Sequence, residues 1–281
     1  MTDMVAVQEL CERAARRPGL VVALTGAGVS AASGIPTFRG QEGYWTVGSE
    51  HYTPQEMATF EMFQRHPEAV WGWYLYRRGV CLAAMPNAAH RALVELEQAL
   101  GERFVLLTQN VDGLHLRAGN SDQRTLQVHG NIHWMRCARE CGQGPLRLPA
   151  SVTARPAGEP LRDAERPPFC CAHCGGWMRP HVLWFDETYD EERYRFQSAL
   201  RAAAQAAMLL VIGTSGATTL PMAAAELAAR SGAVILNVDP GANPFAPLAR
   251  ATGGMHIAGE AVTHVPAVVR TCITAFAPSK P

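Results

Sequence analysis

The sequence predicts an α/β protein built on an open parallel sheet, together with a second, smaller domain. Four short runs rich in β-branched residues and leucine each end in small or polar residues. Such continuous apolar runs indicate strands that are buried on both faces, and polar residues at their ends mark the edge where parallel sheets bind ligands. Stretches with helical periodicity lie between them. The four runs are residues 19–28, 103–112, 207–215 and 233–239.

A glycine-rich loop, "TGAGVSAASG", follows the first of these strands. Gly26, Gly28 and Ala31 fit the pattern G-x-G-x-x-G/A, which serves a tight turn, close approach to a pyrophosphate and helix–strand packing. A plain βα turn is the alternative. The acid expected about 20 residues later is missing, since an aromatic-rich insertion stands there; Asn237 and Asp239 end a later strand instead. The loop predicts dinucleotide binding without ordinary hydride transfer.

The aromatic-rich insertion contains a helix with an unusual face. Pro67 suits a first helical turn, and Val70, Trp71 and Tyr74 have the spacing of one buried stripe. Arg77 follows Tyr74 by three residues, so the phenol and the guanidinium share that face. The helical spacing by itself predicts that the Arg77 side chain extends from the helix edge to solvent. The alternative is that Arg77 faces a partner for its charge.

Two further helices are predicted between the strands. The first occupies "NAAHRALVELEQALG", with Asn87 as N-cap and Gly101 closing it. The second occupies residues 221–232, with Pro221 near its start. Both would cover a face of the sheet.

Polar residues gather at two other strand ends. Gln109, Asn110 and Asp112 follow the second strand, and His129 precedes Gly130 at the end of "TLQVHG". Buried polar groups cost free energy unless they meet a ligand or each other. A histidine at such a position can act as a general base. A set of satisfied buried hydrogen bonds is the alternative, but the clustering favours a functional site.

Five of the eight cysteines fall within 38 residues. Cys137-x-x-x-Cys141 and Cys171-x-x-Cys174 form two pairs suited to tetrahedral zinc, and a full thiolate set predicts a structural site with no open position. Cys170 or His173 could replace one ligand. The clustering indicates metal binding in a reducing compartment. The three isolated cysteines, predicted to be buried free thiols, are Cys11, Cys81 and Cys272.

Composition excludes several classes of protein. The 281 residues carry 25 Lys+Arg and 25 Asp+Glu, so no net charge favours nucleic acid or an anionic membrane as partner. The first residues have no apolar h-region, and the longest apolar run, residues 202–212, is too short to span a bilayer. We expect a cytoplasmic protein with neither nucleic-acid nor membrane partners. The sequence sets no oligomeric state, and a monomer is consistent with it.

The motifs taken together resemble one family over nearly the whole chain: the sirtuins, NAD-dependent protein-lysine deacylases. They occur in the order "GAGVSAASGIPTFRG", "PNAAH", "TQNVDGLH", "VHG", two cysteine pairs, "RPHVLWFDE", "GTS" and "LNVD". "GIPTFRGQEGYW" and "WYLYRR" look most like the class that includes mitochondrial desuccinylases and many bacterial members.

The resemblance implies a Rossmann-like NAD-binding domain and a small domain made of a helical module and a zinc module. The first would comprise residues 1–40, 87–131 and 181–281, and the second residues 41–86 and 132–180. A Pro/Arg-rich stretch within the second, residues 147–168, is predicted to be a flexible excursion.

The resemblance also assigns roles to residues. Those for the pyrophosphate are Gly26, Ala27 and Gly28, those for the nicotinamide pocket are Ile35, Asn110 and Asp112, and Val111 would also bind the cofactor. Phe38 would shield the reacting ribose, with Arg39 and Trp45 in the same loop region. Gln109 and His129 would face the ribose hydroxyls. The adenosine half would contact Gly213, Thr214, Ser215, Asn237, Val238, Asp239 and Ala261.

The substrate side follows from the same resemblance. Tyr74 and Arg77 would bind the distal carboxylate of a succinyl-type lysine, and residues 181–187 would pair with an extended acylated peptide. NAD would be consumed as co-substrate: the acyl oxygen attacks the ribose as nicotinamide leaves, and His129 takes a ribose hydroxyl proton. The products would be lysine, nicotinamide and O-acyl-ADP-ribose. One structural zinc would be held by Cys137, Cys141, Cys171 and Cys174.

Three positions depart from the family pattern. Thr37 stands where Asp is frequent, the first cysteine pair has one extra residue, and Asp186 replaces a common glycine. None removes a catalytic group. Two other functions remain open, namely mono-ADP-ribosyltransfer to protein and a non-catalytic NAD-sensing module. His129 and the complete "TQNVD" argue against the second.

Overall fold

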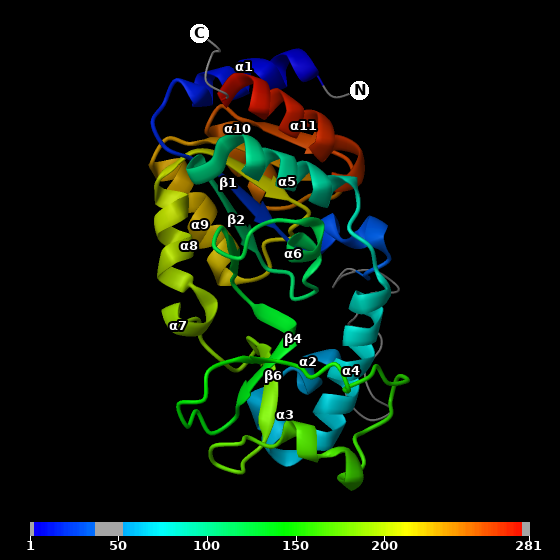
Figure 1. The fold of residues 1–281 in the computed structure, drawn as a ribbon. Helices are drawn as coiled ribbons and strands as arrows, with labels where there is room; N and C mark the ends of the chain where they lie inside the picture. The colour runs from blue at the N-terminus through cyan, green and yellow to red at the C-terminus, as the bar shows by residue number, and fades with distance from the viewer. Residues whose placement is uncertain (1–2, 37–52, 277–281) are drawn as a thin grey trace.

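The computed structural model describes residues 3–36 and 53–276. Its centre is a parallel sheet of six strands in the order β3-β2-β1-β7-β8-β9 (Figure 1). The strands are β1 Leu20–Thr25, β2 Phe104–Thr108, β3 Thr125–Gln127, β7 Ala206–Ile212, β8 Val234–Asp239 and β9 Met255–Ala258. The predicted α/β class is confirmed. The direction of strand progression reverses between β1 and β7, where such sheets open a crevice for ligands.

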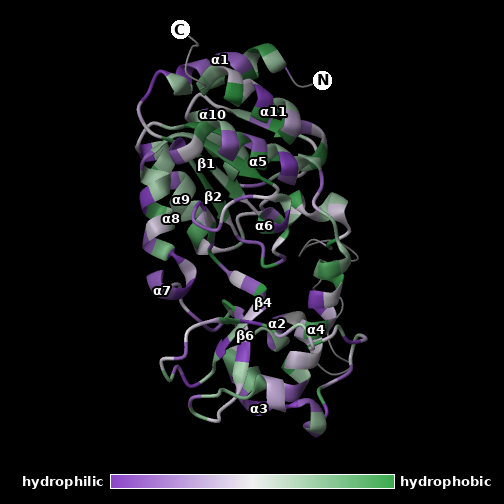
Figure 2. Ribbon diagram, in the orientation of Figure 1, coloured by the Kyte–Doolittle hydropathy of each residue, from purple (hydrophilic) through white to green (hydrophobic). Residues whose placement is uncertain are grey.

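Helices cover both faces of this sheet. One face is covered by α1 (Met4–Ala15), α5 (Ala88–Leu100) and α11 (Ala261–Phe276), and the other by α8 (Phe196–Ala204), α9 (Thr219–Arg230) and α10 (Phe245–Ala251). Alternate residues of β1 supply the two cores: Val21 and Ala23 pack on the first face, Val22 and Leu24 on the second. Strands β1 and β2 are accordingly strongly hydrophobic, whereas α1 and α5 carry residues of both kinds (Figure 2).

The boundaries predicted for the helix at residues 87–101 are confirmed by its caps. The Asn87 side chain accepts a hydrogen bond from the Ala89 amide at 2.9 Å, and the His90 ring accepts one from the Asn87 amide. Gly101 ends that helix, α5, in a backbone conformation with positive φ. Helix α9 spans Thr219–Arg230, so it begins and ends two residues before the predicted range of 221–232. Pro67 is the first residue of α4 (Pro67–Ala83).

A separate hydrophobic cluster is built by the two insertions. It joins α2 (Pro54–Met57), α3 (Phe60–Arg65) and α4 to an antiparallel sheet with strand order β5-β4-β6. These strands are Leu146–Arg147, Gly130–Cys137 and Met178–Val182, and the two remaining short helices are α6 (Leu114–Ala118) and α7 (Glu191–Tyr194). The exact division into domains stays a prediction.

The Pro/Arg-rich stretch is packed, so the prediction of a flexible excursion was wrong. Leu148, Val152 and Leu161 are buried in the second cluster. Arg78 of α4 donates to the Val152 carbonyl at 2.9 Å. A Cβ on Gly72 would lie 2.1 Å from the Glu159 carbonyl oxygen, so the helix and this stretch touch at backbone distance. In the part of the chain that the structure describes, no helix combines the length and apolar character needed to cross a bilayer.

Candidate active site

The glycine loop after β1 crosses the loop after β7 at the carboxyl edge of the sheet. The Gly28 amide donates to the Gly213 carbonyl at 2.8 Å. A Cβ on Gly26 would lie 2.7 Å from that carbonyl oxygen, and one on Gly28 would lie 2.7 Å from the Gly213 Cα. Glycine is therefore required at these positions by close backbone approach. Two 3₁₀ turns follow instead of a helix, and Ala31 is exposed, so its predicted role in helix–strand packing was wrong.

Behind this crossing lies a buried chain of polar groups. The Asn110 amide Nδ2 donates to the Gly26 carbonyl and to Ser30 Oγ, each at 3.1 Å. Ser30 donates to Asp112 Oδ2 at 2.8 Å, and the Leu114 amide donates to the other carboxylate oxygen at 2.8 Å. Burial raises the pKa of Asp112, while these two hydrogen bonds oppose the rise. Residues from the loops after β1 and β2 are thus fixed in one cluster.

Gln109 links the end of β2 to the loop after β7. Its Nε2 donates to Thr214 Oγ1 at 2.8 Å, and Thr218 Oγ1 donates to its Oε1 at 3.4 Å. The side chain is half-buried at the crevice edge. The two loops that meet at the switch point are therefore joined by side chains as well as by backbone.

His129 stands just beyond β3 at the same edge of the sheet. Burial lowers its pKa to about 4, against the opposing effect of a hydrogen bond with the Gln109 backbone. The imidazole is therefore neutral at pH 7 and retains a lone pair, which a general base needs. The Leu183 amide donates to the His129 carbonyl at 3.0 Å, so the segment that follows β6 (Met178–Val182) lies beside His129.

The residues predicted for the adenosine half lie after β7, at the end of β8 and after β9. Ser215 is exposed, and the Asp239 carboxylate accepts a hydrogen bond from the Gly241 amide at 2.8 Å. Asn237 is fully buried and donates to Asn243 at 2.8 Å. The side chains of Val238 and Ala261 lie in the sheet core, so a ligand could meet them only through their backbone.

Tyr74 and Arg77 lie together inside the smaller cluster. The Trp184 indole donates to the Tyr74 hydroxyl at 2.7 Å. The Arg77 guanidinium carbon lies 4.4 Å from the centre of the Trp73 ring and 5.5 Å from that of Tyr74. Arg77 is only 5% exposed, so it does not extend to solvent as helix spacing alone suggests. Burial raises the pKa of Tyr74, and the Arg77 charge opposes this.

The segment after β6 is held by a buried ion pair. Arg179 pairs with Glu187, and its guanidinium carbon lies 3.5 Å from the centre of the Trp184 ring. The same carboxylate accepts the Trp184 amide at 3.0 Å. Trp184 in turn holds Tyr74. These contacts fix the position of this segment, which is predicted to bind substrate, with respect to α4.

Asp186, the residue that departs from the family pattern, has a defined partner. Its two carboxylate oxygens accept hydrogen bonds from the Phe60 and Glu61 amides, at 2.8 and 3.0 Å, at the start of α3. The Phe185 amide donates to the Ala58 carbonyl at 3.0 Å. The segment is thereby tied to the helices of the first insertion.

The four predicted zinc ligands come together. Their sulfur atoms all lie within 4.8 Å of one another, with Cys137–Cys174 and Cys141–Cys171 separations of 3.5 Å. A tetrahedral site with Zn–S bonds of about 2.3 Å has sulfurs roughly 3.8 Å apart, so the set fits zinc.

Neither alternative ligand belongs to this group of sulfurs. Cys170 Sγ faces the Arg166 carbonyl, and His173 Nδ1 contacts Cys141 Sγ at 3.3 Å from outside the set. The extra residue of the first pair is accommodated because Glu140 adopts φ of 50°.

Some predicted residues lie apart from these contacts. Ile35 is buried in the smaller cluster, and Val111 packs against it. Phe38, Arg39 and Trp45 lie outside the described residues, as does Thr37.

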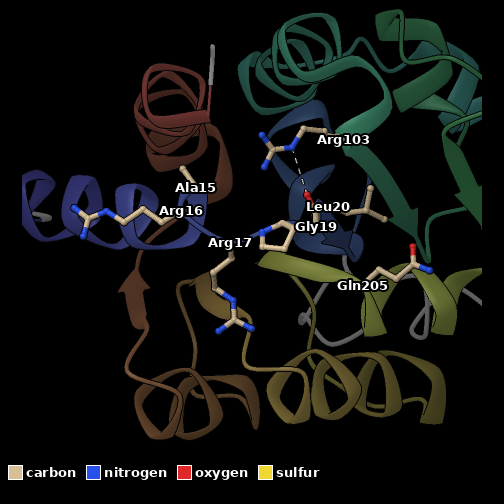
Figure 3. A pocket seen from close by; sticks show the side chains of 8 residues that line it. Ala15, Arg16, Arg17, Gly19, Leu20, Arg103 and Gln205 are labelled. Carbon is tan, nitrogen blue, oxygen red and sulfur yellow. Dashed lines mark hydrogen bonds between the residues drawn. The ribbon is translucent and has the colours of Figure 1, made fainter. Parts of the chain in front are cut away.

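A cavity of about 770 Å³ lies elsewhere, at the opposite, amino-terminal edge of the sheet (Figure 3). It is lined around Gly19 and Gln205, where the guanidinium groups of Arg16, Arg17 and Arg103 point in different directions. Without convergent polar groups it is a poor candidate site. The polar residues at the carboxyl edge carry the chemistry instead.

Four residues of the polar edge were not predicted. Ser30 joins Asn110 to Asp112, and Tyr189 and Thr218 lie beside His129 and Gln109. His115 Nε2 lies 3.1 Å from Thr25 Oγ1, beneath the crossing loops. Ser30 stands within the quoted glycine loop and His115 ends the quoted "TQNVDGLH", so both could have been inferred; Tyr189 and Thr218 have no local signal.

A sequence model described as the Sir2 family matches residues 26–219. The chain belongs to the Sir2 family. That match spans the glycine loop, the His129 strand end and all four cysteines. The family identified here is the one that the ordered motifs resemble, so that prediction is confirmed.

Curated Sir2-family relatives include bacterial proteins. An NAD-dependent protein deacylase of Leptospira interrogans is 39% identical over 225 residues, covering 80% of this chain and 83% of the relative. One from Thermus thermophilus is 43% identical over 232 residues, covering 82% of each.

Solved Sir2 structures share the fold over almost the full length. A Sir2 homolog in complex with NAD is 34% identical, with TM-score 0.77, covering 96% of this chain and 94% of that one. A Sir2 protein with a deacetylated p53 peptide and 3′-O-acetyl-ADP-ribose is 25% identical, with TM-score 0.75, covering 96% and 98%.

Proposed function

We propose that this chain is an NAD-dependent protein-lysine deacylase that prefers succinyl- or malonyl-type groups and also removes acetyl groups. The products would be the free lysine, nicotinamide and O-acyl-ADP-ribose. The observation that carries the proposal is a neutral His129 at the same sheet edge as the Gln109–Asp112 cluster and the crossing glycine loops. The names of the relatives and the ligands of the solved family structures point to the same chemistry.

The residues of the edge suit a dinucleotide substrate. Gly26, Gly28 and Gly213 bring backbone groups to the crevice surface, where side chains would block a pyrophosphate. The buried Asn110 and Asp112 provide an amide and a carboxylate that can fix a carboxamide. NAD supplies an electrophilic ribose carbon when nicotinamide departs.

His129 would then accept a proton from a ribose hydroxyl through its free lone pair. Its low pKa keeps the imidazole unprotonated at physiological pH. Because the base is weak, it must lie within hydrogen-bonding distance of the ribose hydroxyl whose proton it takes. Gln109 would orient the same ribose. Asp112 would hold the nicotinamide carboxamide rather than take part in proton transfer.

The acyl preference rests on Tyr74 and Arg77. A buried guanidinium favours an anionic partner because its own desolvation is costly. A succinyl carboxylate can accept two parallel hydrogen bonds from such a group, with the Tyr74 hydroxyl adding a third. An acetyl group offers the guanidinium no carboxylate and should react more slowly. The zinc would have a structural role, since the four thiolates leave no position for water.

The test is a panel of matched peptides carrying acetyl-, succinyl- or glutaryl-lysine, incubated with purified protein and NAD. We expect mass spectrometry to find O-acyl-ADP-ribose, with the succinyl peptide consumed fastest. Adenine-labelled NAD gives the contrast: label retained on protein would mean mono-ADP-ribosyltransfer. Absence of any product, with NAD bound, would instead favour a sensing module.

A further inference from the structure

The base His129 already has a partner that the proposed chemistry does not use. The Tyr189 hydroxyl lies 2.8 Å from His129 Nε2. Tyr189 follows the predicted substrate segment and precedes α7 (Glu191–Tyr194). Its ring lies between the His129 ring, 5.8 Å away, and the Phe196 ring, against which it stacks at 5.3 Å.

A second hydroxyl, that of Thr218, lies close to this pair. Thr218 is the N-cap of α9, yet its side chain makes no capping hydrogen bond. Threonine at that position usually caps the helix, so the free hydroxyl is available for another use. It donates to Gln109 Oε1 at 3.4 Å and also interacts with the Tyr189 phenol. Tyr189 and Thr218 therefore place two hydroxyls beside His129 and Gln109.

The direction of the Tyr189–His129 bond follows from the protonation states. Burial lowers the pKa of His129 to about 4 and raises that of Tyr189, so both are neutral at pH 7. We assign the imidazole proton to the other ring nitrogen, because the backbone of Gln109 raises the pKa of the ring and so acts as an acceptor toward it. Nε2 is then an acceptor, and the phenol donates to it.

A neutral imidazole has one lone pair, and a general base must offer it to the proton that it takes. The phenol therefore occupies the position that a ribose hydroxyl needs. We propose that Tyr189 is a positioning residue that holds the acceptor nitrogen of His129 in the ligand-free enzyme and yields it to the ribose hydroxyl when NAD binds. The inference rests on the proposed function, because it takes His129 as the ribose base.

Tyr189→Phe keeps the ring and its stacking on Phe196 but removes the competing hydrogen bond. Calorimetric titration with NAD alone, without peptide, should show a dissociation constant lower by roughly two- to tenfold, the range that one neutral hydrogen bond contributes. The kcat at saturating NAD should stay within about twofold, because the phenol no longer contacts Nε2 once NAD is bound.

Two further variants isolate the contact. Tyr194→Phe removes a phenol of the neighbouring segment that bonds Arg136, not His129, and should leave NAD affinity unchanged. In a His129→Ala background, Tyr189→Phe should no longer alter the affinity, since no bond remains to be released. An affinity gain that depends on His129 is a readout that a purely structural role would not produce.

Three results would overturn the inference: an unchanged dissociation constant in Tyr189→Phe, the same gain in the His129→Ala background, or a tenfold loss of kcat at saturating NAD. The last would mean that the phenol stays bonded to His129 during turnover. A wild-type protein that binds NAD but releases no deacylated peptide would refute the proposed function, while the titrations still decide the role of Tyr189. A protein that binds no NAD would refute both.

Discussion

Replacing Arg77 by methionine tests the acyl pocket with little change of shape. Methionine keeps an unbranched side chain against Trp73 and removes the guanidinium. Arg77 is only 5% exposed, so solvent and salt would screen its contact with a carboxylate weakly. Hydrogen bonds to charged groups contribute about 1.5–3 kcal/mol, which corresponds to roughly 10- to 150-fold. We expect kcat/KM for a succinyl peptide to fall at least tenfold.

The acetyl peptide of the same sequence should be little affected or improved, because it offers Arg77 no anionic partner. Steady-state rates on both peptides, at saturating NAD, give the ratio directly. The matched control is Arg78→Met: Arg78 is also buried, but it binds the Val152 carbonyl. That variant should lower the melting temperature and leave the succinyl-to-acetyl ratio unchanged. Equal losses on both peptides in Arg77→Met would mean that Arg77 supports the fold and does not recognise the acyl chain.

The remaining predictions concern the base, the metal and pH. His129→Ala should reduce deacylation by ~10²–10⁴-fold while NAD still binds, and single-turnover activity within a few-fold of wild type would exclude His129 as base. Cys171→Ala should lose the one zinc per chain and lower the melting temperature; folded, active wild-type protein that lacks zinc by metal analysis would contradict this. Burial lowers the pKa values of His90, His129 and His181 from 6.5 to about 4, so the unfolded chain binds more protons between these values. The free energy of unfolding should therefore decrease as the pH falls from about 6.5 toward 4, and a melting temperature independent of pH over that window would show that these rings are not buried neutral.

Much of the fold could be predicted because its signals are local. Asn87 and Gly101 mark the ends of α5 through capping, and Pro67 marks the start of α4. The strands were predictable from apolar runs whose alternate residues serve two cores. The polar edge was predictable because parallel strands bring their carboxyl ends to one side, which places Gln109 and His129 together without any need to know the helices.

The rest depends on contacts between distant segments. Val152 and Leu161 stand in a stretch dense in proline and charge, yet α4 offers them an apolar surface that the local composition does not reveal. Ala31 matches a fingerprint position, but the chain turns into 3₁₀ geometry before a helix can form. Tyr189 lies 60 residues from His129, so no spacing rule links them. The burial of Arg77 depends likewise on the small cluster as a whole.

The Asp186 carboxylate has a consequence for how a peptide would be received. At this position the family pattern favours glycine, the residue that loses most conformational freedom on ordering. Here two hydrogen bonds to the Phe60 and Glu61 amides hold the segment before any ligand arrives. Much of the conformational entropy of this segment is then lost when the protein folds and not when a peptide binds. A docking peptide would meet a segment that is already held in place, at the expense of the adaptability that a mobile glycine gives toward varied sequences.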